Sequence, residues 1–428
     1  MGSGRVVLRA VKEGLALLFL IVIIAVAFFS PAAFADDAEN VCVSCHMELD
    51  DVLKQVAVDW QESAHAKAGI QCQHCHGGNP YDVALAMESS QGFKKKPAPN
   101  EIPALCSKCH SDPVRMRAYN LRSDQYDLFR FSVHGRKLLE QKDAEAPSCV
   151  SCHGKHDIRK VDDPQAKVNR KNIVKTCASC HANKELMDKR KLPHNQLELY
   201  TSSVHGKAYF EKGDLGVPTC FNCHGNHGIE KPQTLATRFV CANCHVEEAD
   251  AFKKSRHWAA AQEGGKPLCV HCHSNHGIER ATLDKFTGQG QLDCVSCHKD
   301  SANIMTVAQG LNESMSKAKG ALSSAEFALK GMEEWSGSGF ETSGLKEKVA
   351  KAQKIYKEMQ VGAHALDGKA IDDQSAAVVA LSNDVMGDVN KMLTELRKRK
   401  LGLIATWVVA FAFCTILWKR SQYCRRDD

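Results

Sequence analysis

Cysteine and histidine recur along this chain at one fixed spacing. The pattern C-x-x-C-H occurs nine times and uses 18 of the 20 cysteines. Two thiols at this spacing can bond to the two vinyl groups of one haem, and the histidine that follows lies under the iron as its proximal ligand. The thiols are those of Cys42, Cys45, Cys72, Cys75, Cys106, Cys109, Cys149, Cys152, Cys177, Cys180, Cys220, Cys223, Cys241, Cys244, Cys269, Cys272, Cys294 and Cys297. The proximal histidines are His46, His76, His110, His153, His181, His224, His245, His273 and His298.

Zinc binding and dithiol redox chemistry are the alternatives for paired cysteines. A structural zinc site takes four ligands from two separated pairs and does not require a histidine directly after every second cysteine. Nine repetitions of the complete pattern therefore predict nine covalently bound haem c groups. Only Cys414 and Cys424 stand outside the pattern.

A second histidine follows three of the motifs closely. In the stretch CFNCHGNHGIEK, residues 220–231, His227 comes three residues after the proximal His224. Three residues span at most about 10 Å, which is too short to pass around the edge of a haem to its opposite face. We therefore expect His227 to bind the iron of a neighbouring haem, and the same holds for His156 and His276.

Four more histidines share a Ser-x-His pattern. Each lies 7 to 15 residues before a motif, so the reach of the chain does not select its iron. Their repetition nevertheless predicts that they are distal ligands. They are His65, His134, His205 and His257, preceded two positions earlier by Ser63, Ser132, Ser203 and Ser255.

These features form an internal repeat. Two motifs, a Ser-x-His between them and usually a trailing histidine make one repeat unit, and two of the units recur at an offset of 71 residues. The repeat units cover about 42–80, 106–160, 177–231 and 241–280, and a single further site lies at 294–298. In repeat unit one, Asn79 stands where the trailing histidine would fall, and we interpret this as room for one open iron.

Seven distal candidates leave two of nine irons without a ligand from these patterns. His364, in the stretch VGAH, is a candidate for one of them. For the other iron the sequence leaves three alternatives, namely a further histidine, a methionine or no side chain at all. The remaining candidates are His194, His74, His271, Met116 and Met187, with core packing as the alternative role for the two methionines.

The motifs lie in too little protein for separate cores. From Cys42 to His298 there are 257 residues, or about 29 per haem, so the haems must supply much of the buried apolar surface. We expect short helices that begin or end at the motifs, long irregular stretches and almost no sheet. The predicted fold class is mainly α with much irregular structure, a multihaem cytochrome c fold organised by stacked haems, followed by a C-terminal helical bundle and one transmembrane helix.

Residues 301–400 have no cysteine and one histidine, and their apolar residues recur at alternating intervals of three and four. The stripes are Leu345, Val349, Ala352, Tyr356, Met359 and Ala363, then Val378, Leu381, Val385, Val389, Met392 and Leu396. They predict a helical hairpin or three-helix bundle. The uncharged run 401–418 that follows is long enough to span a bilayer, which leaves 419–428 as a cytoplasmic tail.

The N-terminus is typical of an export signal. Basic residues precede an apolar run, and Ala33-Phe34-Ala35 offers a small-x-small cleavage site. We therefore expect a signal peptide at 1–35 and a nine-haem domain at 36–300 in the periplasm. The chain would be held in the inner (cytoplasmic) membrane by its single C-terminal span.

The formal net charge of +6 does not indicate nucleic-acid binding. Each ferric haem adds about +1 from its iron porphyrin and about −2 from its two propionates. Nine haems would bring the oxidised chain to roughly −3 and the reduced chain to roughly −12. We expect the scattered Lys and Arg side chains to pair with propionates, and we expect no nucleic-acid partner.

Four stretches together resemble a known family. They are S-V-H-G, C-x-x-C-H-G-x-H, V-G-A-H in a helical part without haem motifs, and R-K-R-K-L-G-L before a single span. They look like the membrane-anchored multihaem cytochromes c of anaerobic respiration, whose haem packing is similar to that of the hydroxylamine oxidoreductase and octahaem tetrathionate reductase group. The resemblance implies that His364 is a distal ligand. Enzymes of that group often have lysine in place of a motif histidine, whereas all nine motifs here end in histidine.

Saturated irons favour electron transfer over substrate chemistry. We expect a carrier that moves electrons between a membrane quinol-linked partner and periplasmic cytochromes or reductases in anaerobic respiration. The run 401–418 carries no acidic or basic residue, so a separate quinone-reactive integral membrane subunit is expected. The alternative is an oxidoreductase that reduces a nitrogen or sulfur oxyanion at one open haem, in the space left at Asn79.

Overall fold

The computed structural model describes residues 40–231, 234–263, 266–283, 294–299, 302–334 and 341–424. The chain divides into two compact bodies. The smaller body is Met1–Ala98 with Lys155–Arg159, and the larger body is Pro99–Gly154 with Lys160–Asp428. The expected signal peptide, 1–35, and the last four residues of the expected tail lie outside the described part.

Helices joined by irregular stretches make up the described residues, which contain no strand, and this confirms the predicted fold class. The smaller body holds α2 (Val41–Glu48), α3 (Asp51–Gln61), α4 (Ala64–Lys67), α5 (Cys72–His76) and η1 (Ser89–Gln91). In the larger body, repeat unit two holds α6 (Ile102–His110), α7 (Pro113–Arg117), α8 (Gln125–Phe131), α9 (Val133–Gly135), η2 (Arg136–Glu140) and α10 (Cys149–His153). Repeat unit three holds α11 (Ile173–His181), α12 (Lys184–Lys189), α13 (Gln196–Ser202), α14 (Val204–Glu211) and α15 (Cys220–His224). Next come α16 (Leu235–Arg238), η3 (Val240–Asn243), α17 (Val246–Phe252), α18 (Arg256–Gln262), α19 (Cys269–His273) and α20 (Cys294–Cys297).

The two motifs of a repeat unit take different helical forms. In repeat units two and three the first motif ends a longer helix, since His110 is the last residue of α6 and His181 the last of α11. The second motif of every unit is itself a single-turn helix, namely α5, α10, α15 or α19. Helices therefore begin or end at the motifs, as the sequence predicts.

A side chain within each single-turn helix caps the helix N-terminus. The backbone N–H that precedes the first cysteine donates to the side chain of the third helical residue, which satisfies a donor that the helix itself cannot. The bonds run from Gln71 to His74 Nδ1 (3.0 Å), Ser148 to Ser151 Oγ (3.1 Å), Thr219 to Asn222 Oδ1 (2.9 Å) and Leu268 to His271 Nδ1 (2.9 Å). Two of the unassigned histidines are therefore capping residues.

The residue after each single-turn helix turns the chain sharply. Gly77, Gly154 and Gly225 have φ values of 69°, 91° and 81° with extended ψ, a region that residues with a side chain rarely adopt. A Cβ at Gly77 would lie 2.3 Å from the carbonyl oxygen of Gly92. Ser274 holds the corresponding place in repeat unit four at φ 67°, with strain of about 1–3 kcal/mol.

The Ser-x-His segments form a tight turn between two helices. Ser203 lies between α13 and α14, where its Oγ donates to the carbonyl of Tyr200 at 2.6 Å and accepts the N–H of Gly206 at 3.0 Å. Ser132 makes the same two bonds in repeat unit two. Both serines are buried. The cap fixes the first turn of the helix that carries the distal histidine.

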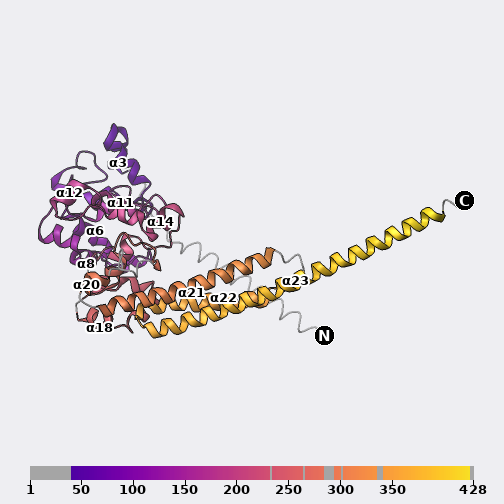
Figure 1. The fold of residues 1–428 in the computed structure, drawn as a ribbon. Helices are drawn as coiled ribbons and strands as arrows, with labels where there is room; N and C mark the ends of the chain where they lie inside the picture. The colour runs from indigo at the N-terminus through magenta and orange to yellow at the C-terminus, as the bar shows by residue number, and fades with distance from the viewer. Residues whose placement is uncertain are drawn as a thin grey trace, which may run out of the picture. The chain divides into compact units, whose positions relative to one another are not determined.

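The C-terminal part is a bundle of long helices that lie side by side (Figure 1). They are α21 (Ala302–Glu334), α22 (Ser343–Gly362) and α23 (Gly368–Cys424), with the short η6 (Ala363–Ala365) between the last two. The apolar stripes of the sequence face the interior, since Val349, Met359, Val378 and Val385 are buried. Helix packing of this kind needs only the periodicity seen in the sequence.

Helix α23 continues past the ends of α21 and α22 (Figure 1). Its most apolar 18-residue window has a mean hydropathy of 2.2, and none of that window is buried. The side chains of Trp407 and Phe411 are 72% and 73% exposed. One C-terminal helix is therefore long and apolar enough to span a membrane, as the sequence predicts.

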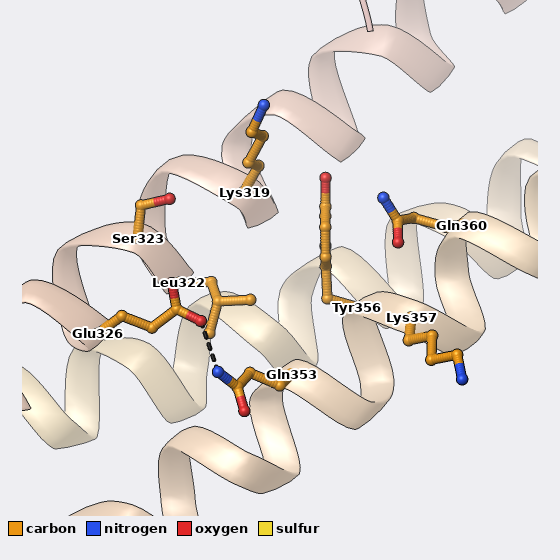
Figure 2. Close-up of a pocket in the computed structure, with 8 residues that line it drawn as sticks. All are labelled: Lys319, Leu322, Ser323, Glu326, Gln353, Tyr356, Lys357 and Gln360. Atoms are coloured by element: carbon orange, nitrogen blue, oxygen red, sulfur yellow. Dashed lines mark hydrogen bonds between the residues drawn. The ribbon is translucent and has the colours of Figure 1, made fainter. Parts of the chain in front are cut away.

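A shallow groove lies between α21 and α22, and Figure 2 shows the side chains that line it. Gln353 donates a hydrogen bond to Glu326 across the groove at 2.7 Å. The lining residues are Lys319, Leu322, Ser323, Glu326, Gln353, Tyr356, Lys357 and Gln360. These eight include no cysteine or histidine, so the candidate chemistry lies at the motifs instead.

Replacing Gly206 by alanine should disturb the turn that carries His205. A Cβ at Gly206 would lie 1.8 Å from the carbonyl oxygen of Tyr200, so the backbone must shift. Overpacking of this kind costs about 1–3 kcal/mol. Gly310→Ala is the matched control, because a Cβ there meets nothing within 4 Å and alanine is the better helix former. Thermal unfolding should show a lower midpoint for G206A only, and equal midpoints would contradict the close approach.

Candidate haem-ligand sites

Seven motif histidines each face a histidine from another part of the chain. The pairs and their ring-centroid distances are His76 with His156 (6.1 Å), His181 with His134 (6.1 Å), His153 with His227 (5.9 Å), His245 with His205 (6.4 Å), His224 with His276 (5.9 Å), His298 with His257 (6.0 Å) and His273 with His364 (6.0 Å). In every pair, one member belongs to a motif and the other is a histidine that the sequence predicts as a distal ligand.

This separation fits one metal ion between two imidazoles. A metal–imidazole nitrogen bond is about 2.0–2.1 Å long and the ring centre lies about 1.1 Å beyond the nitrogen, so two rings on one metal are about 6.3 Å apart. Aromatic contact alone permits about 4.5–7 Å. All seven distances fall between 5.9 and 6.4 Å, and this narrow range favours a common ligand.

The Ser-x-His histidines pair forward along the series of repeats. Three of the four face the first motif of the next repeat unit, or the single site after the last unit. The pairs are His134 with His181, His205 with His245, and His257 with His298. Each of these pairs joins two histidines that are 40 or more residues apart in the sequence.

The trailing histidines pair in the opposite direction. Each faces the second motif of the preceding repeat unit and not the motif that it follows. The pairs are His156 with His76, His227 with His153, and His276 with His224. The short reach from a motif to its trailing histidine makes this exchange necessary if the residue is to bind iron.

The interpretation of Asn79 as the mark of an open iron is wrong for the motif beside it. Trailing histidines pair backward, and no repeat unit precedes the first. The second motif of repeat unit one is served from outside that unit, because His76 faces His156. The pair at His76 is therefore complete without a histidine at position 79.

His364 faces the second motif of the last repeat unit, which no trailing histidine faces. Its ring centroid lies 6.0 Å from that of His273, the second motif of the last repeat unit. It lies in η6, which packs against α17, and its Nδ1 is 3.0 Å from the carbonyl oxygen of Val361. The helical bundle therefore takes the place of a fifth repeat unit.

Backbone hydrogen bonds join the two kinds of distal segment. In each case the residue after the capping serine donates its N–H to the isoleucine that lies two residues after a trailing histidine. The bonds are Ala64 N to Ile158 O (2.8 Å), Val133 N to Ile229 O (2.9 Å) and Val204 N to Ile278 O (2.8 Å). Sequence reasoning missed these isoleucines, although H-x-I recurs after all three trailing histidines.

Backbone carbonyls orient several of the rings. His76 Nδ1 lies 2.9 Å from the carbonyl oxygen of Lys94, and His46 Nδ1 lies 3.2 Å from that of Leu53. When Nδ1 donates to a carbonyl, Nε2 is left as the ligand nitrogen, which is the usual arrangement for a metal-bound histidine.

Burial keeps two of the paired imidazoles, those of His134 and His153, neutral. It lowers the pKa of His134 to about 4, with smaller effects from His181 and Arg190. It likewise lowers the pKa of His153 to about 4, with smaller effects from His227 and His110. A neutral imidazole is the form that binds a metal ion.

The attachment thiols of successive motifs also meet. Within each repeat unit the first thiols of the two motifs lie close enough to affect each other's pKa, as Cys42 with Cys72, Cys106 with Cys149, Cys177 with Cys220, and Cys241 with Cys269. Between repeat units in the larger body, the second thiol of one motif lies within electrostatic range of the next motif and has its pKa raised chiefly by burial and further by that neighbour. These contacts are Cys152 with Cys180, Cys223 with Cys244, and Cys272 with Cys294 and Cys297.

The other candidates have different surroundings. His74 and His271 accept the capping hydrogen bonds described above. Met187 is buried, while His181, the motif histidine before it, faces His134. Met116 is buried at the corresponding position. His194 lies 3.5 Å from the carboxylate of Asp188 on the surface.

Three predicted site histidines remain to be placed. His65 lies on α4 behind its capping serine, and His110 ends α6 with its pKa lowered by burial. They hold the positions that correspond to the paired histidines of the later repeat units. His46 lies on α2, and within the part of the chain that the structure describes no histidine ring pairs with it.

The motif region has little apolar core of its own. Both clusters of buried apolar side chains found among the described residues are built from α21, α22, α23 and the short η6 between the last two. Buried residues near the motifs, such as Leu138 and Val174, belong to neither cluster. A region of this size needs another source of buried apolar surface, which a porphyrin at each motif would supply. Attachment thiols, paired neutral imidazoles and a missing core together fit a c-type cytochrome with several haems.

Comparison with known proteins supports this class. The family model for cytochrome c554 and c-prime matches residues 29–77, which include the first two motifs. Multiheme cytochrome MtrA of Shewanella baltica (strain OS185) is 25% identical over 238 residues, which cover 51% of this chain and 56% of MtrA. The chain therefore spans about half the length of that curated relative. No solved structure matches the chain. These findings support a multihaem c-type cytochrome with covalently bound haem c, for which electron transfer is the suggested activity.

Removing one distal histidine should expose one iron. In His276→Ala, the iron at His224 loses its second imidazole, so about one ninth of the haem should become high-spin and bind carbon monoxide when reduced. His194→Ala is the control, because that histidine faces an aspartate. Electron paramagnetic resonance of the oxidised proteins would measure the change. An unchanged spin state in H276A would contradict the pairing of His276 with His224.

Proposed function

We propose that this chain is a nine-haem electron carrier of the periplasm, anchored in the inner membrane by its C-terminal helix. Each C-x-x-C-H motif would hold one haem c through two thioether bonds and a proximal histidine. Second axial ligands would come from the seven histidines of the repeats and from His364. The haem c groups supply one-electron chemistry, while the protein sets their order, ligation and surroundings.

The paired histidine rings are the observation that carries this proposal, and the closeness of the attachment thiols supports it. In the larger body these thiols connect each motif with the next along the chain, from Cys106 to Cys294. In the smaller body Cys42 lies close to Cys72. Haems attached at neighbouring thiols lie close together, and a row of close one-electron centres suits transport along the molecule.

The paired imidazoles favour transport over catalysis. Two histidines occupy both axial positions of an iron and leave none for substrate. Their mutual distances of 5.9 to 6.4 Å support such saturation for seven irons. Histidine in place of methionine also keeps the reduction potential low, which suits exchange with a quinol pool.

The C-terminal bundle, 301–400, offers a connection to the membrane. His364 faces the second motif of the last repeat unit, and α23 runs from this bundle into the exposed apolar segment. We place 401–418 in the bilayer and 419–428 in the cytoplasm, with export directed by residues 1–35. Electrons would be exchanged at this end with a quinone-reactive integral membrane subunit, since the apolar segment carries no group to handle protons.

Periplasmic cytochromes or reductases are the proposed partners at the other end of the row. A second candidate function, reduction of a nitrogen or sulfur oxyanion, requires an iron with a free axial position. One observation favours it: among the described residues, His46 has no histidine ring facing it. The seven histidine pairs favour the electron carrier over this reductase.

Removing the apolar segment should separate the chain from its electron donor. Truncation after Lys400 should release the haem protein into the soluble periplasmic fraction and slow its reduction by membrane quinol at least about tenfold, because the donor is membrane-bound. Truncation after Arg420 keeps the segment and serves as the control. Reduction would be followed by haem absorbance, with dithionite giving the total haem. Equal quinol-dependent rates in both truncated proteins would contradict the anchored carrier.

A further inference from the structure

The direction of ligand exchange makes one haem motif different from the others. A first motif of a repeat unit receives its distal histidine from the Ser-x-His of the unit before it, as His181, His245 and His298 do. The motif at Cys42 is the first of the nine motifs in the 428 residues. Residues 1–45 contain no histidine at all. The series therefore cannot supply a distal histidine to the haem at His46.

The remaining histidines of the chain are already accounted for. Of the 20 histidines, nine follow a motif and eight are distal ligands of the repeats or the bundle. His74 and His271 cap single-turn helices through Nδ1. His194 lies beside Asp188. No histidine is left over for His46, and this count covers the whole sequence.

Met47 does not fill the place either. It follows His46 directly in α2, too close in the chain to reach the far face of a haem that His46 binds. Met1 is the only methionine before the motif.

The surroundings of His46 suit the attachment and ligation of a haem. His46 is held by the contact of its Nδ1 with the carbonyl oxygen of Leu53, so its other nitrogen is available to iron. The closeness of Cys42 and Cys72 would put this haem next to that of the second motif. The motif is thus oriented for ligation and for electron exchange with its neighbour.

We propose that the iron held by Cys42, Cys45 and His46 keeps one axial position for a small exogenous ligand. The ligand class is that of strong iron-binding small molecules and anions, such as carbon monoxide, nitric oxide, cyanide or nitrite. This inference rests on the proposed nine-haem assignment and adds to it a single ligand-binding site at the first haem. The other eight irons carry two protein ligands each.

Carbon monoxide titration of the dithionite-reduced full-length protein tests the site. The wild type should bind one carbon monoxide per chain. The variant Cys42→Ser, Cys45→Ser should lose one haem by mass analysis and bind none. The matched control Cys294→Ser, Cys297→Ser should also lose one haem but still bind one carbon monoxide.

Each outcome separates this inference from the carrier function. No binding by the wild type, with nine low-spin irons, would overturn the open site and leave the carrier intact. Binding of one carbon monoxide that persists in C42S/C45S would place the open iron elsewhere and also overturn the inference. Binding of three or more carbon monoxide molecules per chain would also contradict the proposal that the other eight irons carry two protein ligands each. If C42S/C45S does not accumulate, the wild type decides alone, because one high-spin ferric iron per chain supports the site and none overturns it.

Discussion

The three-residue tether between a proximal histidine and its trailing histidine constrains the rest of this structure. Because the tether is shorter than the way around a haem, the trailing histidine can serve only another iron. In the structure His227 faces His153 and His276 faces His224, each a motif histidine of the preceding repeat unit. The Ser-x-His histidines pair in the opposite sense along the chain. Two opposed sets of histidine pairs thus join repeat unit three to its neighbours, and the backbone bonds to Ile229 and Ile278 join the same segments.

This exchange explains how a region without a protein core of its own can be ordered. The helices of the second motifs are single turns, which are not stable as isolated helices. Their ends are fixed by local caps such as the Thr219 to Asn222 bond, and their positions by ligands from other units. The bundle of α21, α22 and α23 is different, because it has two ordinary apolar clusters. His364 connects the two kinds of architecture, with its ring presented by the bundle to a motif histidine.

Much of this site could be predicted from the sequence, and the exceptions have physical causes. The motifs, the distal histidines and the apolar stripes depend on local spacing, so the pattern reveals them. The partner of His134 could not be chosen, because 15 residues of chain can reach more than one iron. Asn79 was misinterpreted because the direction of ligand exchange is a property of the fold. The capping role of His74 was hidden for the same reason, since it appears only once the single-turn helix is built.

The central claim is that distal histidines are exchanged between repeat units. An experimental structure of the haem-loaded protein, at a resolution that shows the axial ligands, tests it most directly. It should show Nε2 of His227 bound to the iron held by Cys149, Cys152 and His153, with the equivalent exchange at His276. Finding His227 in solvent, or on an iron other than that one, would contradict the account.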